Sequence, residues 1–191
     1  MVQMFDPTIF ENLKIAFENQ LYDLDNLDGV ISIIDRKDNL DLAVMSRTWT
    51  LTFVLSQVEL KQVPLSAEIV LSSSVQDLAG EILEHEKTHP ACSLMLRFHC
   101  LIDNPLEQCP KIERAITEIW ERNMLPRQSL CAMYDTELHP VHGSPIWLPI
   151  IYRNTIELPF NRRINEDQMD DIDQLIQYTI NTLEAVGDAV L

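Results

Sequence analysis

The chain has 191 residues, of which 46% are hydrophobic and 23% charged, and its 30 acidic residues against 14 basic ones give a formal net charge of −16. This composition is that of a globular protein, and the length fits one domain, so we expect a single domain over residues 1–191. A surface with this charge repels phosphate backbones and anionic membranes and attracts basic protein surfaces, which argues against nucleic acid and membrane partners.

The first third of the chain predicts one helix followed by an antiparallel meander. Between Phe10 and Leu24, large apolar residues recur every three or four positions, which is typical of an amphipathic helix. Residues 29–35 and 40–44 are predicted as strands joined by a turn at residues 36–39. The run Thr48–Phe53 alternates threonines with large apolar residues and predicts a half-buried strand.

The middle of the chain continues with strands and helices in alternation. A strand is expected at residues 68–72, and the pair Ser74 and Asp77 predicts a helix cap directly after it. That second helix must end before Pro90. Residues 92–102 alternate between an apolar and a polar face, and a third helix is expected to start near Pro105 or Pro110 and to extend to about residue 120.

The last part of the chain is less regular before its final helix. Residues 124–145 are predicted to be irregular, and Pro149 suggests that a strand over residues 146–158 lies at a sheet edge or carries a bulge. Asn165 is the predicted cap of the last helix, which we expect Gly187 to terminate. These elements predict an α+β fold, with a mostly antiparallel sheet (the meander plus the later strands) and about four amphipathic helices packed against one face.

The charge is concentrated at the two ends of the chain. Residues 1–41 carry a net charge of −6 (nine acids, three bases), and residues 157–191 also carry −6 (eight acids, two bases). The central 115 residues carry only −4 (thirteen acids, nine bases). If the two end segments pack side by side, they form one acidic face.

A cytoplasmic location is expected from the start of the sequence and from its cysteines. The first residues lack a basic segment followed by an apolar run, and no stretch has the roughly 18 uninterrupted apolar residues of a membrane helix. Cys92, Cys100, Cys109 and Cys131 form no C-x-x-C pair, so we expect reduced thiols, with a pair of disulfides as the alternative.

The sharpest motif is His85-Glu86-Lys87-Thr88-His89, which matches H-E-x-x-H. On a helix, His85 and His89 point the same way and can share a zinc ion while Glu86 activates water, and these five residues resemble the zinc metalloprotease signature. Lys87 stands where that family usually has an apolar residue, and Pro90 places His89 at a helix end. The alternative is a solvated helix terminus with two histidines near the negative end of the dipole.

A second candidate metal site lies in the irregular stretch. Cys131, His139 and His142 are zinc-type ligands, and Asp135 lies between them in sequence. The spacing matches no defined zinc module, so the alternative is an ordinary surface loop. The sequence otherwise indicates no cofactor, because its four glycines include no phosphate-binding pattern.

A candidate ligand site lies on the polar face of the predicted sheet. Arg97 and His99 project opposite the apolar residues of their strand, and with Thr50 and its neighbouring threonines they could line a groove for a small molecule. The alternative is that this face is the solvated side of an antiparallel sheet.

The function that the sequence favours is non-enzymatic protein–protein interaction of the adaptor, chaperone or inhibitor type. The expected partner is a protein with a basic surface, and a homodimer is a further expectation. The opening order of helix, a strand led by Asp28-Gly29 and meander resembles small acidic secretion chaperones over the first third of the chain. The two other hypotheses are a small-molecule-binding domain at Thr50, Arg97 and His99, and a zinc-dependent hydrolase at residues 85–89.

Overall fold

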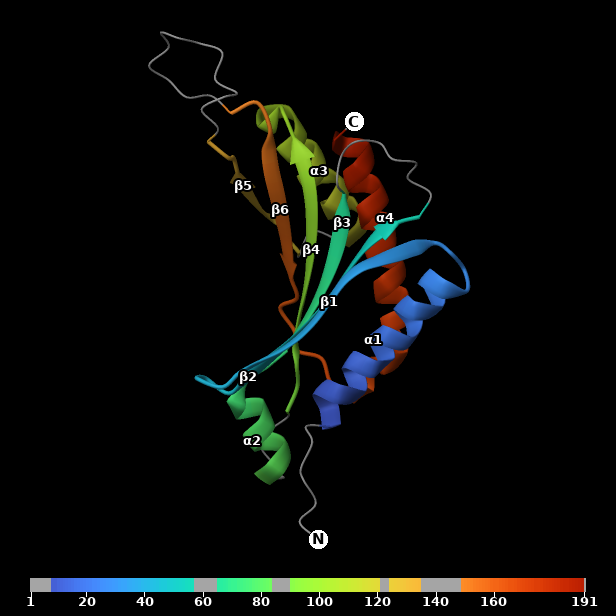
Figure 1. Ribbon diagram of the computed structural model, residues 1–191, viewed down its shortest axis with the longest axis vertical. Helices are drawn as coiled ribbons and strands as arrows, with labels where there is room; N and C mark the ends of the chain where they lie inside the picture. The colour runs from blue at the N-terminus through green and yellow to red at the C-terminus, as the bar shows by residue number, and fades with distance from the viewer. Residues whose placement is uncertain (1–7, 57–64, 84–89, 121–123, 135–148, 191) are drawn as a thin grey trace.

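One six-stranded antiparallel sheet organises the molecule. The computed structural model describes residues 8–56, 65–83, 90–120, 124–134 and 149–190. The strands lie in the order β1-β2-β3-β4-β6-β5, and every neighbouring pair is antiparallel. Their bounds are β1 Ile31–Asp41, β2 Ser46–Leu55, β3 Ser66–Ser73, β4 Ser93–Ile102, β5 Arg127–Cys131 and β6 Tyr152–Pro159 (Figure 1).

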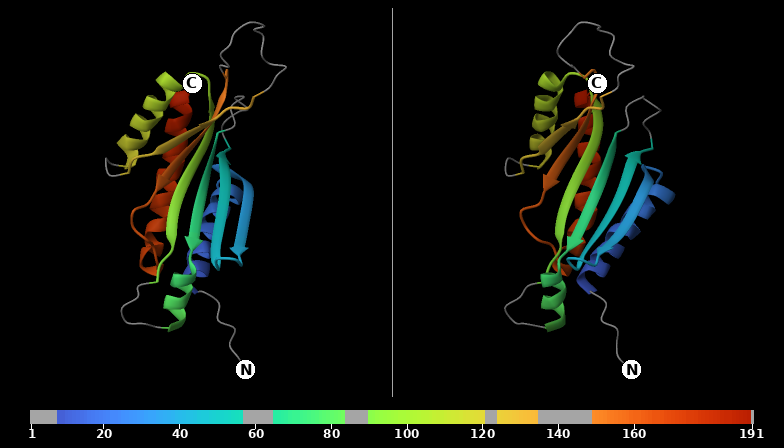
Figure 2. Two further views of the ribbon diagram at one scale, coloured as in Figure 1. Left: turned by 90° about the vertical axis from the view of Figure 1, so that its left-hand side faces the viewer. Right: turned by 60° about the vertical axis from the view of Figure 1, so that its left-hand side comes forward.

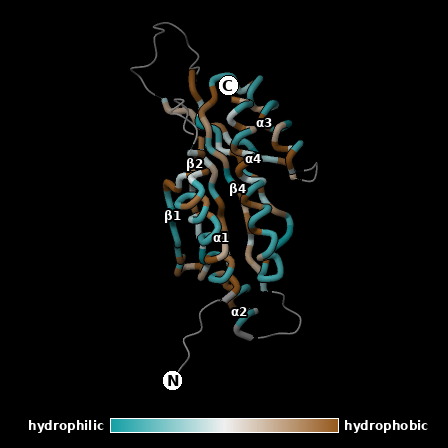
Figure 3. Tube along the Cα trace, turned by 90° about the vertical axis from the view of Figure 1, so that its right-hand side faces the viewer, coloured by the Kyte–Doolittle hydropathy of each residue, from teal (hydrophilic) through white to brown (hydrophobic). Residues whose placement is uncertain are grey.

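Helices cover one face of this sheet. They are α1 Thr8–Asn26, α3 Pro105–Trp120 and α4 Ile172–Val190, with the short 3₁₀ helix η1 Glu166–Asp171 leading into α4. Helix α2 Val75–Leu83 lies beyond one end of the strands (Figure 1), so three of the four helices, and not all four, pack on this face. In the right-hand view of Figure 2, α1 and α4 lie behind the strands, and no described helix covers the front of the sheet. Figure 3 shows the opposite side, where α1, α3 and α4 come forward. The predicted α+β class is confirmed.

The core lies between the sheet and α1, α3 and α4. Alternate residues of β2, β3 and β4 point toward the helices and are fully buried, as the period of two predicted. The helices meet them with residues spaced by three or four positions. The largest fully buried side chains are Trp49, Phe10, Phe17, Phe53, Phe98, Leu13, Leu21, Ile31, Leu51, Ile69, Leu71 and Leu96. None of the described helices is both long enough and apolar enough to cross a membrane.

The acidic ends of the chain lie next to each other. Helix α1 contacts both η1 and α4, and the side chain of Asn12 donates a hydrogen bond to Glu166. Residues more than 150 positions apart in sequence therefore share one side of the molecule, behind the sheet in the right-hand view of Figure 2.

The first predicted turn is wrong. Residues 36–39 do not turn but continue β1, which runs without interruption from Ile31 to Asp41, and the chain reverses only at residues 42–45. Met45 adopts a positive φ of 53° there. The polar residues stay extended because two of them, Arg36 and Asp38, bind side chains of α1.

Three predictions near the end of the chain are also wrong. The stretch 124–145 contains the short strand β5, and β5 takes the edge, so β6 lies inside the sheet between β4 and β5. Pro149 precedes β6 and interrupts none of its hydrogen bonds. The last helix passes through Gly187 and ends at Val190, and a Cβ at Gly187 would lie 3.0 Å from a methyl group of Leu65.

Candidate functional site

On the face of the sheet that no described helix covers (the open face), the polar side chains of β3, β4 and β6 form a row and bind one another. Arg97 lies in cross-strand register with Glu68 of β3 and Glu157 of β6. Its guanidinium pairs with both carboxylates, at 3.2 and 3.1 Å. His99 lies 3.7 Å from Glu68 and shares a 3.3 Å hydrogen bond with Thr155. Interaction with His99, joined by Arg97, lowers the pKa of Glu68 although burial opposes it.

Thr50 does not belong to this row. In the register of the sheet, Thr50 lies beside Val70, whereas Thr52 lies beside Glu68 and so in the row of Arg97. Thr50 is only 9% exposed. The structure thus brings Arg97 and His99 together through carboxylates that the sequence analysis did not include, and it places Thr50 one step away along the strands.

Most of the predicted metal ligands lie outside the described residues. This applies to His85, His89, His139 and His142, so both zinc hypotheses stay predictions. Cys131 is described: it ends β5 and is exposed. Among the described residues, no three side chains of histidine, cysteine, aspartate or glutamate form a group that could hold a metal ion.

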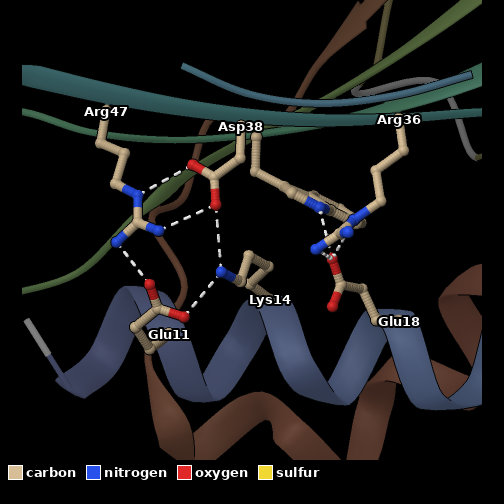
Figure 4. A network of polar contacts seen from close by, with 7 residues as sticks. Glu11, Lys14, Glu18, Arg36, Asp38 and Arg47 are labelled. Atoms are coloured by element: carbon tan, nitrogen blue, oxygen red, sulfur yellow. Dashed lines mark hydrogen bonds and ion pairs between the residues drawn. The ribbon is translucent and has the colours of Figure 1, made fainter. Parts of the chain in front are cut away.

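A second polar network joins α1 to the β1–β2 hairpin (Figure 4). Arg47 pairs with Asp38 at 2.8 Å and also contacts Glu11. Lys14, only 8% exposed, lies 2.7 Å from Glu11 and 3.0 Å from Asp38. The hydrogen bonds from Arg47 outweigh burial and, with those of Lys14, lower the pKa of Asp38 to about 2. This network neutralises carboxylates of α1 and β1 within the molecule.

Glu18 extends the same neutralisation along α1. Its carboxylate forms an ion pair with Arg36 at 2.6 Å and accepts a 2.9 Å hydrogen bond from the indole of Trp49. Its two partners lie on β1 and β2, so an ion pair and a hydrogen bond hold the side of α1 that faces the sheet against the hairpin. The carboxylates of Glu11 and Glu18 are therefore engaged and do not present free charge to solvent.

The carboxylates of η1 and the start of α4 differ from those of α1. Residues 166–173 contain five acidic residues and no basic one, and all five are exposed. Within the described part of the chain, their only ion pair joins Asp171 to Arg162 at 3.8 Å, with both side chains more than 60% exposed. The uncompensated negative charge of the helical side is therefore concentrated here.

A pocket with a volume of about 250 Å³ opens next to these carboxylates. Four aromatic side chains line it: Phe17 of α1, Trp120 at the end of α3, Phe160 after β6, and Tyr178 on α4. Aliphatic side chains of β4, α4 and the segment between β6 and η1 line the remainder, and Asp171 and Arg162 contribute the charged groups.

The rings in this pocket are held in place from several elements. The indole Nε1 of Trp120 donates a 2.7 Å hydrogen bond to Thr182, a buried residue of α4. The backbone N–H of Phe160 donates to the carbonyl of Leu94 on β4 at 3.2 Å. The ring centroids of Phe160 and Tyr178 lie 5.6 and 5.4 Å from that of Trp120.

The sequence analysis missed this pocket because its parts are far apart in the chain. Trp120 was placed on the third helix and the acidic run on the last one, but nothing in their spacing shows that they meet. Tyr178 gave the only local signal, since it is an aromatic residue on a face of the last helix that the apolar stripe does not use.

The rest of the pocket depends on how α3 packs against α4.

No family model matches this chain, and no curated protein or solved structure is significantly similar to it.

Proposed function

We propose that this protein acts non-enzymatically, by binding a partner protein with a basic surface on the side formed by η1, the start of α4 and the aromatic pocket. The observation that carries the proposal is that a pocket with aromatic walls opens beside five exposed carboxylates, of which only Asp171 has an ion pair within the described part of the chain, an exposed one with Arg162. Interfaces commonly combine a desolvated anchor pocket with a polar rim.

The distribution of charge supports this side over the open sheet face. On the open face, Arg97 is already paired with Glu68 and Glu157, so acidic and basic groups balance within the row. On the helical side, Glu11 and Glu18 of α1 are paired with Lys14, Arg36 and Arg47. The carboxylates of residues 166–173 therefore remain the strongest attraction for a basic protein.

Besides the zinc-dependent hydrolase at residues 85–89, which lies outside the described residues, a small-molecule site and a homodimer remain predictions. The small-molecule site at Thr50, Arg97 and His99 would require a ligand to displace existing ion pairs, which makes it the weaker hypothesis. The homodimer can be checked by sedimentation equilibrium across a range of protein concentrations.

The proposal can be tested with a fluorescent 20-residue polylysine as the probe of a basic surface. We expect binding that weakens steeply between 50 and 300 mM NaCl, because charge drives the association. The variant D167N/D170N/D173N should lose most of this affinity.

The matched control is D23N/D28N/D103N, which removes three exposed carboxylates elsewhere and leaves the same net charge. It should bind nearly as well as the wild type. Equal loss in both triple variants would show that net charge alone attracts the probe and would contradict the proposed surface, as would an absence of binding.

A further inference from the structure

The walls of the aromatic pocket have the geometry of a cation-binding site. Trp120 contacts two other rings of the lining, and its plane makes an angle of 87° with Phe160 and of 47° with Tyr178. The three rings form one cluster and all line the same pocket. The face of an aromatic ring carries negative potential and attracts a cation within about 6 Å of the centroid.

The pocket is also ordered before any ligand arrives. The indole of Trp120 is held by the buried hydroxyl of Thr182, and that hydroxyl donates to the carbonyl of Tyr178 at 2.7 Å. This chain of hydrogen bonds fixes the indole of Trp120 relative to α4, the helix that carries Tyr178. Little conformational entropy is lost when a ligand binds between groups that are already fixed.

The charged groups at the pocket favour a positive ligand. Asp171 is part of the lining, and Asp170 and Asp173 are exposed on the same two turns. Arg162 is the pocket's own cation, but it is 70% exposed and lies 3.8 Å from Asp171, so a ligand can replace it without breaking a buried pair.

The apolar lining restricts the kind of cation. Leu94, Ile164 and Ile172 are each less than 7% exposed and line the pocket beside the rings. A small hydrated ion gains nothing from such a surface. A lysine or arginine side chain fits better, because its methylene stem covers apolar surface while its charged head stays near a carboxylate.

We propose that the pocket between α3, α4 and the segment after β6 receives one lysine or arginine side chain of the partner, with Trp120, Phe160 and Tyr178 around its stem and Asp171 as its counter-charge. This inference rests on the proposed function, since the side chain is supplied by the basic partner. It adds the chemical identity of the anchor. A neutral apolar anchor and an anion paired with Arg162 are the occupants that the test must separate from it.

The experiment uses peptides that differ at one central position. Each has six lysines spaced by glycine and serine, and the guest residue in the middle is lysine, norleucine or glutamate. Norleucine keeps the stem of lysine and lacks the ammonium group. We expect the lysine guest to bind 3- to 10-fold more tightly than norleucine, as measured by fluorescence anisotropy at 100 mM NaCl, and the glutamate guest to bind most weakly.

Variants then assign this preference to the pocket. D171N and Y178A should each reduce the preference for lysine over norleucine to less than 2-fold, whereas Y178F, which keeps the ring, should retain it. R162A should raise affinity for the lysine guest by about 2-fold because it removes a competing cation. D188N, at the far end of α4, is the matched control for the loss of one carboxylate and should leave the preference unchanged.

The outcomes separate the inference from the proposed function. If the peptides bind through residues 166–173 but norleucine equals or exceeds lysine, the anchor is apolar and the inference is wrong while the proposed function stands. If R162A abolishes binding of every peptide, or the glutamate guest binds best, the pocket takes an anion and the inference is again wrong. If no peptide binds, both are wrong.

Discussion

Asp38 shows how one residue sets the conformation of a strand. Its carboxylate accepts hydrogen bonds from Arg47 at 2.9 and 2.8 Å and from the buried Lys14 at 3.0 Å. In sequence, the run of charged residues around it reads as a turn, because such residues are common in turns. The cations that bind Asp38 lie on α1 and β2, so only the folded chain supplies the reason for the extended backbone.

We predict that D38N destabilises the protein mainly above pH 4. The pKa of Asp38 is lowered from 3.8 to about 2 in the fold. Its charged form therefore contributes stability that is fully present above pH 3.8 and is lost as the pH falls toward 2. After allowance for solvent screening, we expect a loss of about 1 kcal/mol at pH 7.

The measurement is urea unfolding of the wild type and D38N at pH 7, 5 and 3. The difference in the free energy of unfolding should be constant between pH 7 and 5 and smaller at pH 3. D23N, which removes an exposed carboxylate of α1, should show no such dependence. A difference that grows as the pH falls would contradict the assignment.

For the candidate ligand residues, the sequence predicts the face of the sheet on which each side chain lies but not its neighbours on adjacent strands. The alternation in β4 correctly placed Arg97 and His99 on the face opposite the core. It could not show that Glu68 and Glu157 stand beside Arg97, because cross-strand neighbours depend on register. The same limit explains why Thr50 was grouped with Arg97, although Thr52 is the threonine in that row.

At the scale of elements, local signals located most helices and strands well. The predicted cap at Ser74 is confirmed: its backbone N–H and its hydroxyl both donate to Asp77, at 2.8 and 2.6 Å. Asp77 lies within 2.6 Å of Arg163, so this cap also ties α2 to the segment before η1. Capping is predictable because donor and acceptor lie within one turn of each other.

We predict that N165A destabilises the last helix by about 1 kcal/mol. Asn165 accepts the backbone N–H of Asp167 at 3.0 Å, and its own N–H donates to the side chain of Gln168 at 2.9 Å. Loss of the cap leaves first-turn donors without a partner. Urea unfolding measures the change.

N161A is the matched control for this prediction, because Asn161 is exposed in the segment before η1. It should change the free energy of unfolding by less than 0.5 kcal/mol, which is the usual range for such surface changes. Equal effects of both substitutions would mean that the cap contributes nothing specific.

The elements that the sequence placed wrongly are those whose position depends on a distant neighbour. Strand β5 was missed because Arg127–Cys131 is short and largely exposed, and it becomes a strand by pairing with β6. The glycine at 187 resembled a helix terminator, yet α4 continues through it. Its close approach to Leu65 gives a packing reason for a small residue there.

In the molecule as a whole, paired and unpaired carboxylates lie in different places. Arginines of the hairpin pair with Glu11 and Glu18 of the N-terminal helix, whereas among the five acidic residues at positions 166–173 only Asp171 has an ion pair within the described part of the chain. The densest group of exposed carboxylates that contribute to the net charge of −16 therefore lies beside the aromatic pocket.

We predict that the protein does not bind nucleic acid. Its charge repels phosphates, and the described basic residues of the hairpin are engaged in ion pairs. Fluorescence anisotropy of a labelled 20-base-pair DNA duplex at 50 mM NaCl should not change up to roughly 100 µM protein, the upper range of non-specific binding. A decalysine peptide is the positive control, and saturable binding by the protein would contradict the electrostatic argument.

The class of fold, the helix caps, the buried faces and the excess of negative charge are predictable from the amino-acid sequence, because each follows from residues within one or two turns or from composition. Which carboxylates are neutralised, which strands lie at the edges, and that Trp120, Phe160 and Tyr178 meet beside Asp171 become visible only in the folded chain. These features depend on contacts between residues far apart in the chain. Such contacts leave no periodic signal in the sequence, since register and helix packing are fixed only when the whole core assembles.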